Sequence, residues 1–274
     1  MFLCYTKAQK NILFGVIILD FRKIFDSSVS TGEFDKWRTC YCDECFVDVI
    51  EHAELDANKT ALEIGPGTGQ ATEPILKTGC SYLAIELGEN FTEAMKERFG
   101  SYSNFKIVNA DFETYDFGKS QFDLIYSAAT MQWIPEEVGF PKVYDLLKNN
   151  GIFAMMFTQT DYKSANEALY KKIQEVYDKH FHPEIEYTCN LEYNNITKYG
   201  FIDFECREYH KVREYNADEF ASCISIMAPH LTLQEPYKFK FFEGIKDAIL
   251  SFGNKIILND TIVLYLTRKT QICK

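Results

Sequence analysis

Three glycines at alternate positions are the clearest sign of chemistry in this chain of 274 residues. They stand in the run Glu63-Ile64-Gly65-Pro66-Gly67-Thr68-Gly69-Gln70, directly after the apolar residues Ala61 and Leu62. A strand that enters such a loop and continues into a helix lets backbone N–H groups approach a ligand, because no Cβ atoms obstruct it. We therefore expect a ligand-binding turn here rather than a plain connection between strand and helix.

Acidic residues follow at the ends of the next two predicted strands. Glu86 ends the first of them, about twenty residues after the glycines, where a carboxylate can accept hydrogen bonds from both hydroxyls of a ribose. Asp111 follows the second strand, and with Phe112 it is placed to contact an adenine ring. Together with the glycine loop, these residues predict an adenosine pocket.

The charge of the loop indicates which adenosine cofactor it binds. The dinucleotide fingerprint has a third glycine where Gln70 stands, and the Glu63 carboxylate would repel a pyrophosphate. A ligand that carries an ammonium or sulfonium group is instead attracted by this acid. The pattern therefore favours S-adenosylmethionine over NAD.

Alternating strands and helices must position these residues. Strands are predicted over 60–64, 81–86, 105–109, 122–127, 151–157, 201–209 and 255–267, and helices over 41–53, 70–77, 90–99, 136–147, 164–179, 217–227 and 235–252. This alternation predicts an α/β fold with a parallel sheet and helices on both faces. The helical excursion before the last strand is expected to form a lid over the carboxyl edge of the sheet, where open α/β folds bind ligands.

The glycine motif, Glu86, Asp111 and the stretch 122–134 (FDLIYSAATMQWI) resemble the class I S-adenosylmethionine-dependent methyltransferases. Within that superfamily the chain is similar to the small-molecule branch that includes the trans-aconitate and ubiquinone/menaquinone biosynthesis methyltransferases, from about Phe34 to Phe157. The resemblance implies a Rossmann-like, seven-stranded, mostly parallel sheet whose last strand is antiparallel. It divides the chain into an N-terminal extension (1–33), a cofactor core (34–160) and a C-terminal part (161–274), with the acceptor lid at about 210–254.

The resemblance also implies a set of site residues. The cofactor S-adenosylmethionine, which leaves as S-adenosylhomocysteine, is expected to contact Arg38, Glu63, Gly65, Pro66, Gly67, Gly69, Glu86, Leu87, Asp111, Phe112, Ser127 and Ala128. Arg38 lies in a segment similar to an N-terminal motif that closes on the cofactor carboxylate, although Thr39 replaces the proline of that motif. No catalytic residue is identified, and His230, Gln132 and Trp133 are the candidates on the acceptor side.

The amino-acid composition limits the chemical class of the methyl acceptor. With 29 basic and 40 acidic side chains the net charge is −11, which argues against a polyanion such as nucleic acid. The Asn/Asp-Pro-Pro-aromatic motif of adenine or glutamine methylation is also absent after the fourth strand. We therefore predict a small-molecule acceptor. A protein or RNA methyltransferase and a non-catalytic S-adenosylmethionine-binding regulatory partner remain as alternatives.

The cysteines and the N-terminus bear on location and metal binding. Nine scattered cysteines predict reduced thiols in the cytoplasm. Separately, we expect the chain to be a monomer or homodimer. The group Cys40, Cys42 and Cys45 lacks a fourth ligand for zinc, so no metal is expected, and Cys42 and Cys45 are expected to share one apolar helix face. The apolar stretch 12–19 is too short to span a membrane, and we expect a packed extension there rather than a targeting signal.

Overall fold

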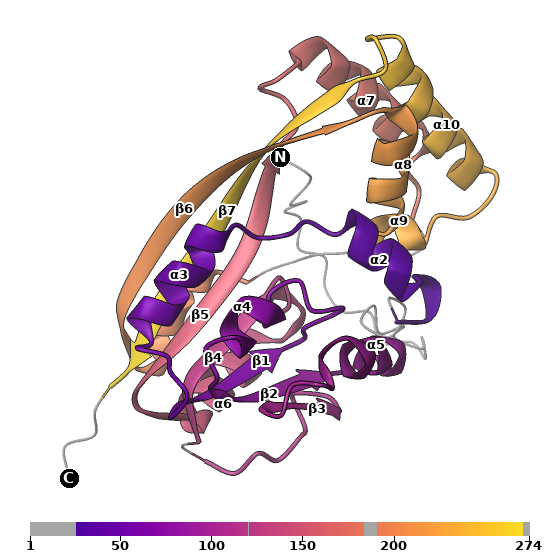
Figure 1. Ribbon diagram of the computed structural model, residues 1–274. Coiled ribbons are helices and arrows are strands. Elements are labelled where there is room, and N and C mark those ends of the chain that lie inside the picture. Colours follow the sequence, from indigo (N-terminus) through magenta and orange to yellow (C-terminus); the bar gives the residue numbers. More distant parts are fainter. Residues whose placement is uncertain (1–25, 120, 184–190, 271–274) are drawn as a thin grey trace, which may run out of the picture. The chain divides into compact units, whose positions relative to one another are not determined.

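Seven strands form one sheet, in the order β3-β2-β1-β4-β5-β7-β6 (Figure 1). The computed structural model describes residues 26–119, 121–183 and 191–270, so the apolar stretch 12–19 lies outside the described residues. The strands are β1 (Thr60–Ile64), β2 (Ser81–Glu86), β3 (Phe105–Asn109), β4 (Phe122–Ala128), β5 (Leu147–Asp161), β6 (Phe201–Tyr215) and β7 (Ile256–Lys269). The helices are α2 (Thr31–Trp37), α3 (Asp43–His52), α4 (Thr72–Leu76), α5 (Glu89–Phe99), η1 (Met131–Trp133), α6 (Glu136–Leu146), α7 (Glu167–His180), η2 (Tyr193–Tyr199), α8 (Ala217–Ser225), α9 (Ala228–Leu231) and α10 (Tyr237–Leu250).

Strands β1 to β5 pair in parallel and bring their carboxyl ends to one edge. Ile64 lies beside Ile85, and Glu86 lies beside Asn109. On the other side of β1, the end of β4 pairs with β5 through Ala128 and Met156. The segments that follow β1, β2, β3 and β4 therefore start from the same edge of the sheet, as the sequence predicted.

Strand β7 runs antiparallel to both of its neighbours. Along β5, the ring of Phe157 stacks on Tyr265, whereas the earlier residue Leu147 accepts a hydrogen bond from the later residue Lys269. Along β6, Thr267 donates to the carbonyl of Ile202 near the start of that strand. Residue numbers rise on one strand as they fall on the other, which defines antiparallel pairing. The predicted fold class, with an antiparallel last strand and helices inserted before it, is confirmed.

Helices cover both faces of the sheet. On one face, helices α3, α4 and α5 bury alternate strand residues such as Ala61 and Tyr82. On the other face, α6 and η2 cover residues such as Leu62 and Phe153. Cys45 is buried on the α3–α5 face and Cys42 packs against the same cluster, which confirms their predicted apolar role. None of the six cysteines among the described residues forms a disulfide.

The chain divides into two compact units, each made of separate segments. Among the described residues, the sheet unit comprises 39–119, 121–159, 191–210 and 261–270, and the helical unit comprises 26–38, 160–183 and 211–260. Helices α7, α8 and α10 enclose the apolar core of the helical unit. In the same unit, Arg213 forms a buried ion pair with Asp260, which also accepts a hydrogen bond from Thr160 at 2.7 Å. No helix among the described residues is long and apolar enough to cross a membrane.

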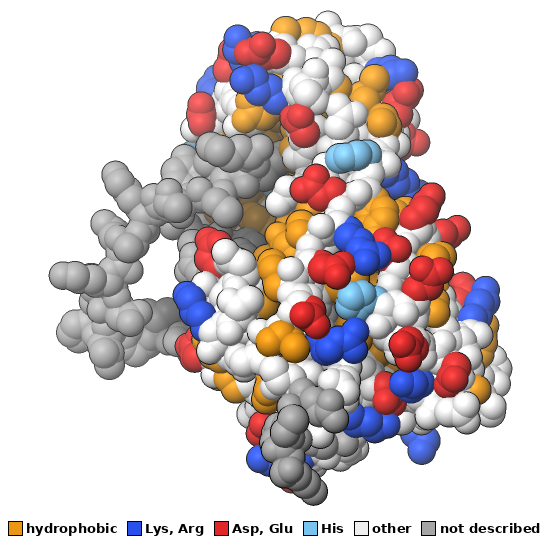
Figure 2. Space-filling view, turned by 90° about the vertical axis from the view of Figure 1, so that its left-hand side faces the viewer, with side chains coloured by type: hydrophobic (Ala, Val, Ile, Leu, Met, Phe, Trp, Pro, Cys, Tyr) orange, Lys and Arg blue, Asp and Glu red, His pale blue; other side chains and the backbone are white. Residues whose placement is uncertain are grey.

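Strand β6 lies at the edge of the sheet and is protected by charge. Its exposed side chains include Asp203, Glu205, Glu208 and Lys211. Figure 2 shows acidic and basic side chains interspersed over the face that lies to the left in Figure 1. Charged side chains on an edge strand oppose pairing with a strand of another chain.

Candidate functional site

The glycine loop after β1 requires glycine for two separate reasons. Gly65, Gly67 and Gly69 all have positive φ angles, of 64°, 60° and 93°, a region that disfavours residues with a Cβ atom. A Cβ on Gly65 would also lie 2.4 Å from Thr130, and one on Gly69 would lie 2.4 Å from the ring of Phe99. The loop is therefore shaped by close neighbours as well as by its turn.

Helix α4 contributes less to this loop than the sequence suggested. The predicted helix began at Gln70, whereas α4 begins at Thr72 and has five residues. A helix of one and a half turns carries a small dipole, because few peptide groups add to it. The electrostatic contribution expected from the helix end is correspondingly small.

Glu86 fastens the glycine loop to the next turn. Its carboxylate is 8% exposed and accepts hydrogen bonds from the N–H of Gly67 at 3.1 Å and from the N–H of Gly88 at 2.9 Å. The Asn109 amide donates to the carbonyls of Glu86 and Leu87, both at 3.1 Å. The structure thus brings together the predicted cofactor residues Gly67, after β1, and Glu86 and Leu87, at the end of β2.

The segment after β3 places Asp111 and Phe112. Asp111 Oδ1 accepts a hydrogen bond from the N–H of Glu113 at 2.9 Å, which starts a tight turn. The Phe112 side chain is 5% exposed and packs against Phe117, with ring centroids 5.9 Å apart. The Phe112 ring therefore forms part of the core, and the exposed edge of the segment is left to Asp111 and to the backbone.

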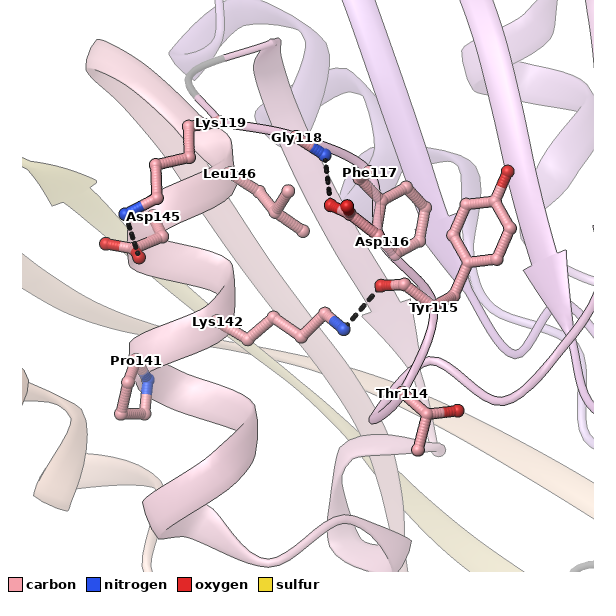
Figure 3. A pocket seen from close by; sticks show the side chains of 10 residues that line it. All are labelled: Thr114, Tyr115, Asp116, Phe117, Gly118, Lys119, Pro141, Lys142, Asp145 and Leu146. Carbon is pink, nitrogen blue, oxygen red and sulfur yellow. Dashed lines mark hydrogen bonds and ion pairs between the residues drawn. The ribbon is translucent and has the colours of Figure 1, made fainter.

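Lys142 of α6 holds this segment, a role that the sequence did not reveal. Its Nζ donates to the carbonyls of Glu113 at 3.1 Å and Tyr115 at 2.6 Å, and lies 5.3 Å from the Phe112 ring centroid. Burial lowers the pKa of this lysine, although nearby acids raise it. Figure 3 shows Lys142 reaching across a cavity of about 390 Å³ toward the loop. The described residues between β3 and β4 form no helix, and Lys142 holds this connection in place through its two hydrogen bonds.

The residues from β1 to β5 match a known family. A family model described as a methyltransferase domain matches residues 62–155, the segment that holds the glycine loop, Glu86 and Asp111. These residues are a class I S-adenosylmethionine-dependent methyltransferase domain. The predicted superfamily is confirmed.

Curated relatives match this methyltransferase domain over part of their length. The ribosomal RNA small subunit methyltransferase A of Borreliella burgdorferi is 31% identical over 111 residues, which are 40% of this chain and 38% of the relative. The protein of that name from Hahella chejuensis is 25% identical over 147 residues, 53% of this chain and 52% of the relative. The chain thus spans about two fifths to one half of the length of these relatives.

Solved structures share the fold at low sequence identity. A proposed type II methyltransferase from Anaeromyxobacter dehalogenans has a TM-score of 0.62 and 14% identity, over 85% of this chain and 99% of that chain. Phosphoethanolamine N-methyltransferase 2 from Haemonchus contortus, in complex with phosphomonomethylethanolamine and S-adenosylhomocysteine, has a TM-score of 0.57 and 17% identity, over 93% of this chain and 61% of that chain. These similarities support the class I fold.

The methyltransferase domain has a strained turn where β4 ends. Ser127 Oγ donates to the carbonyl of Ile64 at 3.4 Å, which ties β4 to the strand before the glycine loop. Ala129 has a φ of 56°, unusual for a residue other than glycine. Thr130 then donates to the carbonyl of Gly65 at 2.9 Å. Predicted residues Ser127 and Ala128 therefore lie beside the loop, and Thr130 makes a further contact that no motif in the sequence indicates.

Glu63 lies beneath the loop rather than at its surface. It is 1% exposed, and its Oε2 accepts hydrogen bonds from Thr72 at 2.6 Å and from the Tyr82 hydroxyl, which itself contacts Tyr126. Among the described residues, Glu63 Oε1 has no hydrogen-bond partner. Burial raises the pKa of Glu63, although these hydroxyl groups lower it. The structure brings Glu63 together with Thr72, and its contact with the cofactor stays a prediction.

Gln132 and Trp133 form the short helix η1 and meet a segment far away in sequence. Tyr193 of η2 donates to Gln132 Oε1 at 3.4 Å. The Glu136 carboxylate accepts from Asn195 at 2.9 Å and from Tyr199 at 3.4 Å. Segment 193–199 is therefore held against the start of α6, a contact that no local motif in the sequence indicates.

The two remaining candidates, His230 and Arg38, belong to the helical unit. His230 is 2% exposed, and its Nε2 lies 2.8 Å from the Tyr177 hydroxyl, with Phe241 beside the ring. Burial lowers the pKa of His230 to about 3, so the imidazole is neutral at physiological pH. Its surroundings are those of a core residue rather than of an exposed base. Arg38 follows α2, and its guanidinium lies 5.5 Å from the Phe34 ring centroid.

Proposed function

We propose that this protein transfers a methyl group from S-adenosylmethionine to a small-molecule acceptor and releases S-adenosylhomocysteine. The observation that carries the proposal is the left-handed glycine loop, which Glu86 holds at the carboxyl edge of the methyltransferase domain. In this proposal Gly65, Pro66, Gly67 and Gly69 lie under the methionine part of the cofactor.

The other predicted cofactor residues have roles set by their positions. We assign the ribose hydroxyls to Glu86 and the neighbouring backbone of Leu87, and the adenine to Asp111 and the segment at Phe112. The backbone at Ser127 and Ala128 would line the methionine moiety, with Glu63 acting from below through Thr72. We assign the cofactor carboxylate to Arg38, as the sequence resemblance implies.

Methyl transfer makes modest chemical demands on the protein. The acceptor lone pair forms a bond to the methyl carbon as the carbon–sulfur bond breaks, and alignment of the reactants can lower such a barrier by roughly 7–11 kcal/mol. A base is required only for a protonated acceptor. The burial of His230 argues against that histidine as the base, and we place Gln132 and Trp133 beside the acceptor.

RNA methylation is the second candidate, favoured by the match to ribosomal RNA methyltransferases over 111 residues. Two observations oppose it. The net charge of −11 disfavours a polyanion, and the run Ser127-Ala128-Ala129-Thr130 stands where an adenine methyltransferase would carry Asn/Asp-Pro-Pro-aromatic. We therefore place the small-molecule acceptor first.

Transfer of labelled methyl groups separates these candidates. The full chain is incubated with methyl-labelled S-adenosylmethionine and with the small-molecule or the RNA fraction of a cell extract. We expect label in the small-molecule fraction. Label confined to RNA would replace our proposal with the second candidate, and cofactor binding without transfer to either fraction would indicate a regulatory partner.

Location and assembly complete the proposal. The six described cysteines form no disulfide, which supports a reducing, cytoplasmic setting. We propose a monomer or homodimer, which light scattering on the purified chain would establish.

A further inference from the structure

Four stacked aromatic side chains line the sheet unit on the side of η2. Phe157 of β5 lies against Tyr193 of η2, with ring centroids 4.8 Å apart and planes 5° from parallel. Tyr193 stacks on Tyr265 of β7 at 4.9 Å, and Tyr265 stacks on Phe204 of β6 at 5.4 Å. All four side chains are half-buried. We call this group the aromatic wall.

Two hydrogen bonds and a short stretch of chain link the aromatic wall to the glycine loop. Tyr193 donates to Gln132, and Gln132 lies two residues after Thr130, which donates to the carbonyl of Gly65. Two residues span at most about 7 Å along the chain. The wall therefore begins beside the loop that is proposed to hold the methyl donor.

Acidic groups surround the aromatic wall. Glu192 directly precedes Tyr193, and Glu208 lies four residues after Phe204 on β6, so that these two side chains share one face of the strand. Burial raises the pKa of Tyr265, and Cys206, Glu208 and Glu192 raise it further. Glu136 supports η2 from the other side through Asn195. Lys198 of η2 donates to Asn195 Oδ1 at 2.6 Å. Aromatic faces and carboxylates together attract a cation and repel an anion.

We propose that the aromatic wall binds an alkylamine and that the amine nitrogen is the methyl acceptor. This inference rests on the proposed function. The nitrogen lone pair bonds to the methyl carbon, the carbon–sulfur bond breaks, and its electron pair stays on sulfur. The positive charge thereby moves from the sulfonium to the nitrogen, where the wall stabilises it. A tertiary alkylammonium gives up its single N–H proton to water before the transfer, which frees the lone pair, and the quaternary product has no proton to lose, so no base from the protein is required. A phenolate or carboxylate acceptor would meet repulsion from the acidic surroundings.

Binding of a matched pair of probes to the full chain tests the inference. Choline carries a quaternary ammonium group, and its carbon isostere dimethylbutanol has the same shape without the charge. With the chain saturated by S-adenosylhomocysteine, we expect calorimetry to show about tenfold tighter binding of choline. Tyr193→Leu removes the central ring and should abolish this preference, and Phe157→Leu should weaken it.

Tyr102→Leu provides the control, because Tyr102 is a half-buried aromatic residue that packs on the α3–α5 face. It should keep the preference for choline, and all three variants should bind S-adenosylhomocysteine as the parent does. Equal binding of the two probes would overturn the inference. So would absence of binding by both probes while S-adenosylhomocysteine binds normally, and the proposed methyltransferase function would survive that result. Failure of the parent to bind S-adenosylhomocysteine would instead overturn the proposed function, and this inference with it.

Discussion

The two sides of the carboxyl edge are built in different ways. On the cofactor side, after β1, β2 and β3, the contacts are made by backbone groups, glycines and one buried carboxylate, as where Gly67 donates to Glu86. On the proposed acceptor side, after β4 and β5, aromatic rings such as Phe157 and Tyr193 stack on one another. In our proposal the first side holds one polar cofactor through its backbone, whereas a few side chains of the second side select the acceptor.

This difference indicates which kind of residue would determine the choice of acceptor. Folds that hold the same cofactor use glycines and strand-end acids at the same positions, because the shape of the cofactor fixes the backbone geometry around it. A ring pair such as Tyr193 and Tyr265 forms only after the chain has folded. Mutations should therefore separate cofactor affinity from acceptor affinity.

The largest effect is expected for Glu86→Ala. The change leaves the N–H groups of Gly67 and Gly88 without their buried acceptor and removes the proposed ribose ligand. Hydrogen bonds to charged groups contribute about 1.5–3 kcal/mol each, so the dissociation constant for S-adenosylmethionine should rise about 100-fold. Calorimetric titration measures this dissociation constant. The control is Glu97→Ala, which changes an exposed residue of α5. A loss of less than threefold would contradict the proposed role of Glu86.

Gly65→Ala should come next. The left-handed backbone costs a residue with a side chain about 1–2 kcal/mol, and the new Cβ would meet Thr130 at 2.4 Å. We expect cofactor affinity to fall by about tenfold or more, with partial recovery in the double variant with Thr130→Ala. Gly253→Ala is a matched control, since Gly253 has a φ of 86° but no neighbour within 4 Å of an added Cβ. Equal losses of affinity in the two single variants would show that the effect is not local.

Lys142→Met should reduce cofactor affinity by about fivefold, because the carbonyls of Glu113 and Tyr115 lose their donor. Lys119→Met is the control, since Lys119 is exposed and pairs with Asp145 on the outer rim of the same cavity (Figure 3). Titration with S-adenosylmethionine compares the two. If acceptor affinity fell while cofactor affinity held, Lys142 would belong to the acceptor side.

Glu63→Gln should have the smallest effect on binding and a distinct effect on stability. Because burial raises the pKa of Glu63 above its ordinary value of 4.5, ionisation opposes folding. The parent should lose free energy of unfolding as the pH rises from 4.5 through the raised native pKa. The glutamine variant should lack this loss.

Denaturant unfolding of both proteins at acidic and neutral pH measures the difference. In the exposed control Glu97→Gln, the pH dependence should match that of the parent. A glutamine variant with the same pH dependence as the parent would show that Glu63 titrates as an ordinary carboxylate.

The sequence predicted the cofactor side more fully than the acceptor side. The predicted bounds of β1, β2 and β3 agree with the structure, because apolar runs there end at glycine or an acid. β6 extends to Tyr215, beyond its predicted end at Tyr209. Several of its last residues are charged, a pattern that does not indicate a buried strand, but Arg213 forms an ion pair with Asp260 of β7. A pairing partner 47 residues away leaves no local pattern in the sequence.

The missed site residues have the same cause. Lys142 and Tyr193 act on segments 27 and 61 residues away, so neither belongs to a motif that can be read along the chain. His230 attracted notice as a histidine, but its value as a base depended on exposure, which the sequence does not encode. The structure encloses it beside Tyr177.

Titration of the purified full chain with S-adenosylmethionine, S-adenosylhomocysteine and NAD tests the central claim most directly. That claim is that the glycine loop and Glu86 hold a sulfonium cofactor rather than a dinucleotide. We expect saturable binding of S-adenosylmethionine and S-adenosylhomocysteine at one shared site and no binding of NAD. Saturable binding of NAD, or absence of binding by S-adenosylmethionine, would contradict it.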